Sequence, residues 1–214
     1  TKYEDEPVEL GKGITGYSFP SQYVHHTDLE RIQNKPQLID ELRGYSAYGL
    51  QKIDGQSFTA IYNVIEDELL IASADKLIVK DYPEASNIYL EIAERYDLKK
   101  KLKESYAFHL SEPEKITSVA IQCELAGPGI RKNRLGLAEK ELFLFNVAYT
   151  CRNMFYANLP SLESMSKALG IRMPKMVFLG DFKFESVEEL LKFAEQDVYE
   201  NGHPQEGVVF KPVV

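Results

Sequence analysis

Cysteine, long apolar runs and net positive charge are all scarce in this sequence. It contains two cysteines, Cys123 and Cys151. Neither has Cys or His neighbours at the spacing of a metal site, so we expect buried, reduced thiols in a cytoplasm-like compartment. No apolar run approaches the ~20 residues that cross a bilayer, so no membrane partner is expected. The net charge of −8 argues against wholesale electrostatic capture of nucleic acid.

Two local basic tracks interrupt this acidic background. One is formed by Lys99, Lys100, Lys101 and Lys103, and the other by residues 131–134, Arg-Lys-Asn-Arg. The lysine track coincides with a predicted helix, and a solvated helix face is its simplest interpretation. The second track falls in a predicted loop.

Composition and patterning predict a globular α+β fold. The 214 residues are 44% hydrophobic and 27% charged, which suits one large or two small domains. Apolar spacing and cap residues predict helices at 28–33, 35–43, 87–104, 162–169 and 187–200, with Ser161 and Ser186 as N-caps of the last two. Strands are predicted at 47–53, 58–65, 69–79, 117–125, 141–149, 176–184 and 207–213. This order favours antiparallel sheets flanked by helices.

A lysine at the end of the first predicted strand is the main candidate for chemistry. Lys52 is followed by Ile53, Asp54 and Gly55, and an Asp-Gly pair turns the chain. A solvated hairpin is the ordinary interpretation of such a tetrapeptide. With a reference pKa near 10.4, a lysine is a nucleophile only where the site favours its neutral form or supplies a bound cation.

Three further clusters follow at strand ends or on strands. Glu124 precedes the glycine-rich residues 127–129, Phe145 lies in an aromatic strand, and Glu206 opens a strand that carries Lys211. Singly, each has an ordinary structural explanation, such as a core ring or a solvated strand end. Glu206 and Lys211 are an odd number of residues apart, so both can face one cleft only across a twist or bulge.

Together the clusters resemble the covalent nucleotidyltransferase superfamily, in its ATP-dependent RNA ligase 2-like branch and bacterial relatives. Residues 52–55 resemble its nucleophile motif, and 124–133 resemble the RNA-ligase form of its third motif. Residues 143–146 are similar to its adenine-stacking strand, and 206–211 to its fourth motif. In bacterial members a small β-barrel can precede the catalytic domain, and the lead-in at 19–21 and 30–34 is similar to theirs.

The resemblance implies a nucleotide cleft between antiparallel sheets and a three-step RNA sealing reaction. Lys52 would take AMP from ATP, pass it to an RNA 5′-phosphate, and a 3′-hydroxyl would then displace it. Mg²⁺ or Mn²⁺ would be held by Asp54 and Glu206, which with Lys52 form the implied catalytic set. The implied nucleotide-binding residues are Leu50, Gln51, Lys52, Ile53, Glu124, Phe145 and Lys211. A monomer acting on nicked or broken RNA, in RNA repair, is expected in the cytoplasm or, if phage-encoded, in the host cytoplasm.

The sequence departs from the family pattern in three places. Ala74 stands where an arginine is usual, and Gln51 stands where a glutamate often precedes the lysine. The last motif, Lys-x-Lys, would follow Lys211 but is not reached. We therefore expect a lead-in or linker at 1–18, a nucleotidyltransferase domain at 19–214 cut before that motif, further domains in the natural protein, and weak or no self-adenylylation of this piece. A DNA ligase, a GTP-using capping enzyme and a catalytically degenerate binding domain are the alternatives.

Overall fold

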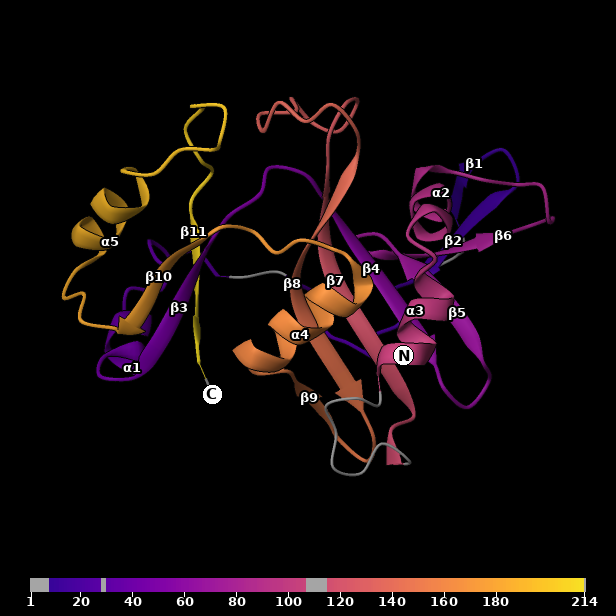
Figure 1. Ribbon diagram of the computed structural model, residues 1–214, viewed down its shortest axis with the longest axis horizontal. Coiled ribbons are helices and arrows are strands. Elements are labelled where there is room, and N and C mark those ends of the chain that lie inside the picture. The colour runs from indigo at the N-terminus through magenta and orange to yellow at the C-terminus, as the bar shows by residue number, and fades with distance from the viewer. Residues whose placement is uncertain (1–7, 28–29, 107–114, 214) are drawn as a thin grey trace. The chain divides into compact units, whose positions relative to one another are not determined.

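The computed structural model describes residues 8–27, 30–106 and 115–213 (Figure 1). The chain divides into two compact units, each built from three segments. The first contains Thr1–Thr27, Gln56–Cys123 and Leu144–Arg172; the second contains Asp28–Gly55, Glu124–Phe143 and Met173–Val214. The mixture of antiparallel sheets and helices confirms the predicted α+β class.

An eight-stranded sheet dominates the first unit. Its order is β1-β2-β6-β5-β4-β7-β8-β9. The bounds are β1 Val8–Gly11, β2 Ile14–Ser18, β4 Gln56–Asn63, β5 Glu68–Ala72, β6 Lys76–Lys80, β7 Ser118–Ala126, β8 Glu141–Thr150 and β9 Met154–Tyr156. From Phe58 onward β4 is fully buried, as expected for a central strand. The last residues of β7 and the first of β8 belong to the second unit.

Residues 8–18, expected as part of a lead-in, are strands of this sheet. β2 pairs with β6 from Ile14↔Lys80 to Ser18↔Lys76, and β1 pairs with β2. Ile14 is 1% exposed. β1 and β2 are therefore part of this sheet.

The strand predicted at 69–79 is two strands, because a turn at residues 73–75 reverses the chain. The Ser73 hydroxyl accepts from Lys76 N (3.2 Å), and Ser73 N donates to Lys76 O (2.8 Å). A serine side chain that bonds backbone groups a few residues away favours a turn over a continuous ladder. Ala74, the residue in the arginine position, lies in this turn.

Within the described residues, three helices accompany the first sheet: α2 Ile88–Arg95, α3 Leu98–Ser105 and α4 Leu159–Leu169. The single helix expected at 87–104 is broken because Asp97 adopts a left-handed conformation with φ +52°. Asn158, and not Ser161, caps α4: its side chain accepts from Ser161 N at 3.1 Å. Asn is as good an N-cap as Ser, and Pro160, two residues after the cap, suits the first turn of the helix.

The lysine track on α3 is engaged within the first unit. Lys103 and Lys99 approach the Asp67 carboxylate at 2.9 and 3.7 Å, and Lys101 donates to the carbonyl of Leu169 at 2.7 Å. The last contact satisfies a carbonyl at the end of α4, where a cation is favourable. These contacts support a structural role for the track.

The second unit is a three-stranded sheet, β10-β3-β11, with two helices. The strands are β3 Ser46–Gln51, β10 Met176–Asp181 and β11 Val208–Pro212, and the helices are α1 Leu38–Leu42 and α5 Val187–Ala194. The helix expected at 28–33 is absent from its described part: residues 30–31 are irregular and 32–34 form a turn, while 28–29 lie outside the described residues. Ser186 caps α5 as predicted and accepts from Glu189 N at 3.1 Å. The helix ends at Ala194 and not at residue 200.

An aromatic cluster fixes β3 within this unit. Phe178, Phe182, Phe184, Phe193 and Phe210 pack edge to face or tilted, with ring centroids 5.2–6.1 Å apart. A side chain at Gly49 would approach the Phe178 and Val208 side chains to 3.0 Å. Glycine at this point lets the cluster close on β3, the strand that leads to Lys52.

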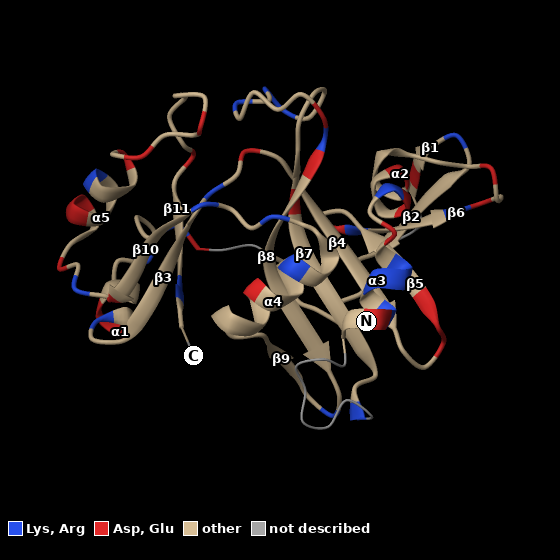
Figure 2. Cartoon of the chain, viewed as in Figure 1, with Lys and Arg blue, Asp and Glu red and all other residues tan. Residues whose placement is uncertain are grey.

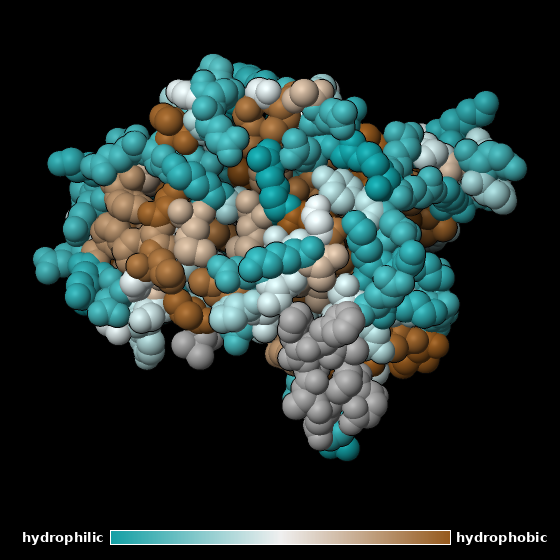
Figure 3. All heavy atoms as spheres, viewed as in Figure 1, coloured by the Kyte–Doolittle hydropathy of each residue, from teal (hydrophilic) through white to brown (hydrophobic). Residues whose placement is uncertain are grey.

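The described helices include none long and apolar enough to cross a membrane. Large exposed hydrophobic side chains are spread over many elements. On the face drawn in Figure 3, hydrophilic and hydrophobic residues are intermixed. Cys123 is buried as expected, whereas Cys151 is partly exposed; both are free thiols.

Candidate active site

The second unit brings Lys52 and Glu206 together as an ion pair. Lys52 directly follows β3, and its amide N donates to Gly207 O at 2.8 Å, which extends the β3–β11 ladder by one step. Its side chain is 48% exposed, and that of Glu206 is 35% exposed. The amine is therefore accessible to a substrate while its backbone is fixed.

Glu206 reaches Lys52 because it lies before the regular part of β11. The strand begins at Val208, and Gly207 intervenes with φ +156°, a value that residues with a side chain rarely adopt. Lys211 itself pairs with Tyr48, so it shares a sheet face with Tyr48 and Leu50.

Glu124 is the third member of this group. Burial, and then the negative charge of Glu206, raise the pKa of Glu124 to about 7; Lys52, Arg131 and the Gly55 amide act in the opposite direction. A carboxyl group with a pKa near neutrality in a polar cluster marks a candidate functional site. The structure thus collects three of the predicted residues at one place.

Gly55 permits the approach of Glu124 to the turn. An added Cβ at Gly55 would lie 2.4 Å from Leu125 O and 2.8 Å from Glu124 Cγ. Both distances are shorter than Cβ contacts in real proteins, so a side chain could not be accommodated without movement. The glycine is therefore needed for the contact between two sequence motifs.

Asp54 is held by an arginine that the sequence did not assign to the site. Arg134 Nε lies 3.1 Å from Asp54 Oδ2, and the Asp54 side chain is 20% exposed. Arg131 Nε donates to Gly55 O at 3.2 Å. Both arginines come from the second basic track, residues 131–134. Its position at the end of the third motif was the only feature of the sequence that could have linked it to the site.

Tyr199 is a second residue that sequence analysis missed. Its hydroxyl donates to Lys52 O at 2.6 Å and accepts from Glu206 N at 3.2 Å. The residue is 2% exposed and packs with Ile53, Ala126 and Phe143. One phenol therefore fixes the backbone of both partners of the ion pair.

The other predicted nucleotide-binding residues have different surroundings. Leu50, Gln51 and Ile53 are buried, and Gln51 Nε2 donates to Val198 O at 3.1 Å. Burial lowers the pKa of Lys211 to about 8. Phe145 is partly exposed on β8 and belongs to the first unit, so it is described separately from Lys52.

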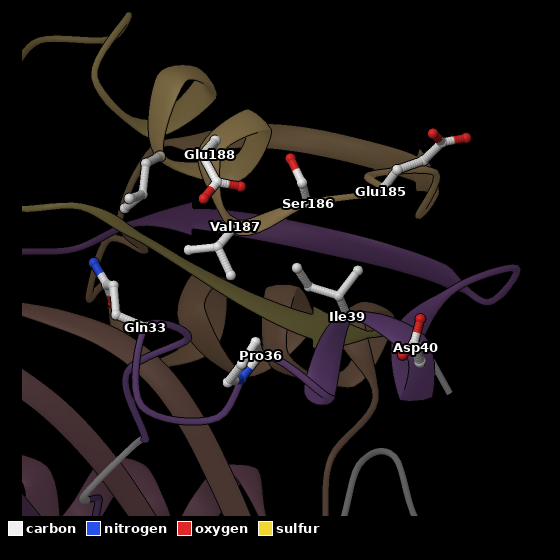
Figure 4. Close-up of a pocket in the computed structure, with 9 residues that line it drawn as sticks. Gln33, Pro36, Ile39, Asp40, Glu185, Ser186, Val187 and Glu188 are labelled. Carbon is white, nitrogen blue, oxygen red and sulfur yellow. The ribbon is translucent and has the colours of Figure 1, made fainter.

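A hollow of about 590 Å³ lies elsewhere in the second unit, between α1 and the start of α5 (Figure 4). It contains none of the predicted site residues. Its lining is Gln33, Pro36, Ile39, Asp40, Glu185, Ser186, Val187, Glu188 and Leu191. The acidic lining does not favour a phosphate-bearing ligand.

Comparison with protein families decides the assignment of the chain. The family model described as RNA ligase matches residues 48–214. This chain belongs to the RNA ligase family. The match includes the ion-paired Lys52 and Glu206, together with Glu124. A comparison with curated proteins finds no significant match.

Solved structures of the Naegleria gruberi RNA ligase share this fold. A variant with ATP and Mn has a TM-score of 0.78 at 22% identity. The match covers 98% of this chain and 58% of the Naegleria chain. A variant with AMP and Mn gives 0.75 at 21% identity, covering 100% and 60%. The enzyme with PPi gives 0.74 at 21% identity, covering 92% and 54%. This chain thus spans little more than half the length of these relatives.

Proposed function

We propose that this chain is the nucleotidyltransferase part of an ATP-dependent RNA ligase, with Lys52 as the residue that carries AMP. The observation that supports it best is the Lys52–Glu206 ion pair with Glu124 beside it. The family match and the solved RNA ligases with ATP, AMP and PPi agree with this chemistry.

In the first step the Nζ atom of Lys52 forms a bond to the α-phosphorus of ATP. The bond from that phosphorus to the bridging oxygen breaks, and the electron pair leaves with pyrophosphate. The amine must lose a proton, and the Glu206 carboxylate is placed to accept it. AMP then passes to the RNA 5′-phosphate, which frees Lys52, and a 3′-hydroxyl displaces AMP to close the strand.

A divalent cation fits the available carboxylates in a limited way. No cluster of three or more His, Cys, Asp or Glu that could hold a metal occurs among the described residues. Mg²⁺ commonly uses only one or two carboxylates and completes its shell with water and substrate phosphates. Glu206 and Asp54 would hold it, although Asp54 first has to leave Arg134. When bound, the cation neutralises charge that accumulates on the phosphates.

The remaining residues would bind the nucleotide. Glu124 would accept a hydrogen bond from a ribose hydroxyl, Phe145 would stack on adenine and Lys211 would bind phosphate. Leu50, Gln51 and Ile53 would contribute through their backbone, because their side chains are buried. RNA ends are the proposed partner, and the proposed state is a monomer.

The test is intact mass after incubation with ATP and Mg²⁺ or Mn²⁺. We expect an increase by one AMP moiety, absent in Lys52→Ala and retained in Lys183→Ala, whose lysine is 79% exposed and pairs with Asp181. An adduct that persists in Lys52→Ala would assign the nucleophile to another residue.

Replacing ATP by GTP, and RNA nicks by DNA nicks, tests the competing substrates. We expect ATP and RNA to be preferred. If neither nucleotide modifies the protein, even with a Lys-x-Lys strand added after its C-terminus, it is better described as a binding domain without this chemistry.

A further inference from the structure

Two arginines from the loop between β7 and β8 reach back to the turn that follows Lys52. Arg134 contacts the Asp54 carboxylate and Arg131 contacts the Gly55 carbonyl, each through Nε. Figure 2 shows positively charged positions along this loop. Asp54 and Gly55 lie only two and three residues after Lys52. These contacts therefore place both guanidinium groups in the vicinity of the Lys52–Glu206 ion pair.

The loop that carries these arginines is held in a defined shape. The Asn133 side chain bonds both backbone groups of Leu137, at 3.0 and 3.1 Å, and Asn201 Nδ2 donates to Arg134 O at 2.8 Å. Arg131 and Asn133 adopt left-handed backbone conformations, with φ of +46° and +44°. Non-glycine residues adopt this region infrequently, and it persists where surrounding contacts require it.

The charges of the two arginines are available to a ligand in different degrees. Arg134 faces the Asp54 carboxylate, whereas the Nε contact of Arg131 is to a neutral carbonyl, which does not itself compensate the positive charge. Arg131 is exposed and still lowers the pKa of Glu124, so its charge acts at the site. A guanidinium fixed through Nε retains its two terminal NH₂ groups, which form the fork suited to phosphate oxygens.

We propose that Arg131 and Arg134 form a phosphate-binding subsite beside Lys52. The inference rests on the proposed ligase function and names the substrate group that these residues bind. Two substrates carry such a phosphate: ATP, through the phosphates beyond the α-phosphate, and RNA, through its 5′-phosphate. Binding of phosphate by Arg134 also releases Asp54.

The test measures binding without requiring turnover. Arg131→Gln and Arg134→Gln keep an amide donor for the anchoring contacts but remove the charge. Arg131→Lys restores the charge without the fork. Arg43→Gln is the matched control, because Arg43 forms a comparable ion pair with Asp40 in the same unit, at 2.8 Å. Dissociation constants are measured for ATP and for one RNA oligonucleotide with a 5′-phosphate or a 5′-hydroxyl.

We expect each Gln variant to weaken binding of one phosphate-bearing probe by about 10- to 100-fold, the effect of losing a charge-assisted hydrogen bond. Arg131→Lys should recover part of the loss, and Arg43→Gln should bind as wild type. Weakening confined to ATP assigns the subsite to the nucleotide; a lost preference for 5′-phosphate over 5′-hydroxyl assigns it to RNA.

The inference is overturned if both Gln variants bind ATP and both RNAs as tightly as wild type. It is also overturned if the Gln variants lose affinity equally for 5′-phosphate and 5′-hydroxyl RNA and bind ATP as tightly as wild type. A wild-type protein that binds normally but acquires no AMP, even with a Lys-x-Lys strand added after its C-terminus, would instead contradict the proposed function.

Discussion

Gly55 and Glu124 lie so close together that no side chain fits between them. A Cβ at residue 55 would be 2.8 Å from Glu124 Cγ and 2.4 Å from Leu125 O. The turn after Lys52 can therefore contact the end of β7 because Gly55 has no side chain. Sequence analysis assigns the Asp-Gly pair to chain reversal, whereas the structure gives the glycine a second, steric requirement.

Gly55→Ala should separate these two segments and impair the site. Forcing a methyl group into a packed position costs about 1–3 kcal/mol, so the melting temperature should fall and AMP labelling of Lys52 should decrease. Gly180→Ala is the control, because a Cβ at Gly180 meets nothing within 4 Å and only the backbone conformation is affected. Equal effects of the two changes on labelling would argue against the steric explanation.

Glu124→Gln should stabilise the protein at high pH. The folded pKa of about 7 exceeds the ordinary value of 4.5, so the folded state holds more protons between these values and stability falls as pH rises through them. A neutral amide avoids this cost. The stability gain of the variant should be absent below pH 4.5 and reach about 1–3 kcal/mol above pH 7.

Urea unfolding at pH 4.5, 6 and 8 measures this gain. Glu84→Gln, at an exposed loop position, provides the reference for a solvated carboxyl group. A gain that does not depend on pH would show that folding does not shift the pKa of Glu124. AMP labelling should still decrease in Glu124→Gln if the carboxylate accepts from ribose.

Tyr199→Phe should slow the labelling of Lys52 more than it weakens ATP binding. The change removes only the hydroxyl that bonds Lys52 O and Glu206 N. Loss of such a bond costs about 0.5–1.5 kcal/mol, which corresponds to a rate decrease of about 2- to 13-fold if it misaligns the ion pair. Single-turnover labelling over a range of ATP concentrations separates the rate from the KM.

Tyr45→Phe is the comparison for this experiment, since Tyr45 is 63% exposed. Unchanged labelling in Tyr199→Phe would show that the hydroxyl contributes only to folding and not to the alignment of Lys52. A raised KM with an unchanged rate would place its effect on ATP and not on Lys52.

Lys211→Met should stabilise the protein at neutral pH. Burial lowers the pKa of Lys211 to about 8, below its ordinary value of 10.5. The unfolded state therefore holds more protons between these values, and the cost of burying the charge is fully present below pH 8. The variant's advantage, about 1–3 kcal/mol at pH 7, should disappear above pH 10.5, as followed by unfolding in urea.

Phosphate binding should reverse this shift in Lys211, because an anion favours the charged amine. Pyrophosphate should then bind with proton uptake near pH 8–9, detectable by calorimetry in buffers of different ionisation enthalpy. Lys183→Met is the exposed control. Uptake that persists in Lys211→Met would arise from another group.

The strand-end acids and the lysine were predictable because each is marked by its local sequence. Lys52 follows an apolar run, Glu124 lies three residues before Gly127, and Glu206 directly precedes Gly207. Their convergence could be expected only from the resemblance to a family, since periodicity does not reveal which strand ends meet.

Contacts between distant segments explain what the sequence could not show. The Tyr199 hydroxyl bonds a residue 147 positions away, and its local surroundings gave only the end of a helix that in fact stops at Ala194. The left-handed residue Asp97 likewise divides an uninterrupted apolar pattern into α2 and α3. Such backbone choices depend on packing and not on propensity.

The central place of β3 has a kinetic consequence. This strand is paired on both sides, by β10 and β11, and the amides of Gln51 and Lys52 bond Lys175 O and Gly207 O at 2.8 Å. Local opening that exposes these amides must break neighbouring ladders, so their deuterium uptake should be slow. Lys52, the proposed nucleophile, thus follows a strand whose backbone should be among the most persistent of its unit.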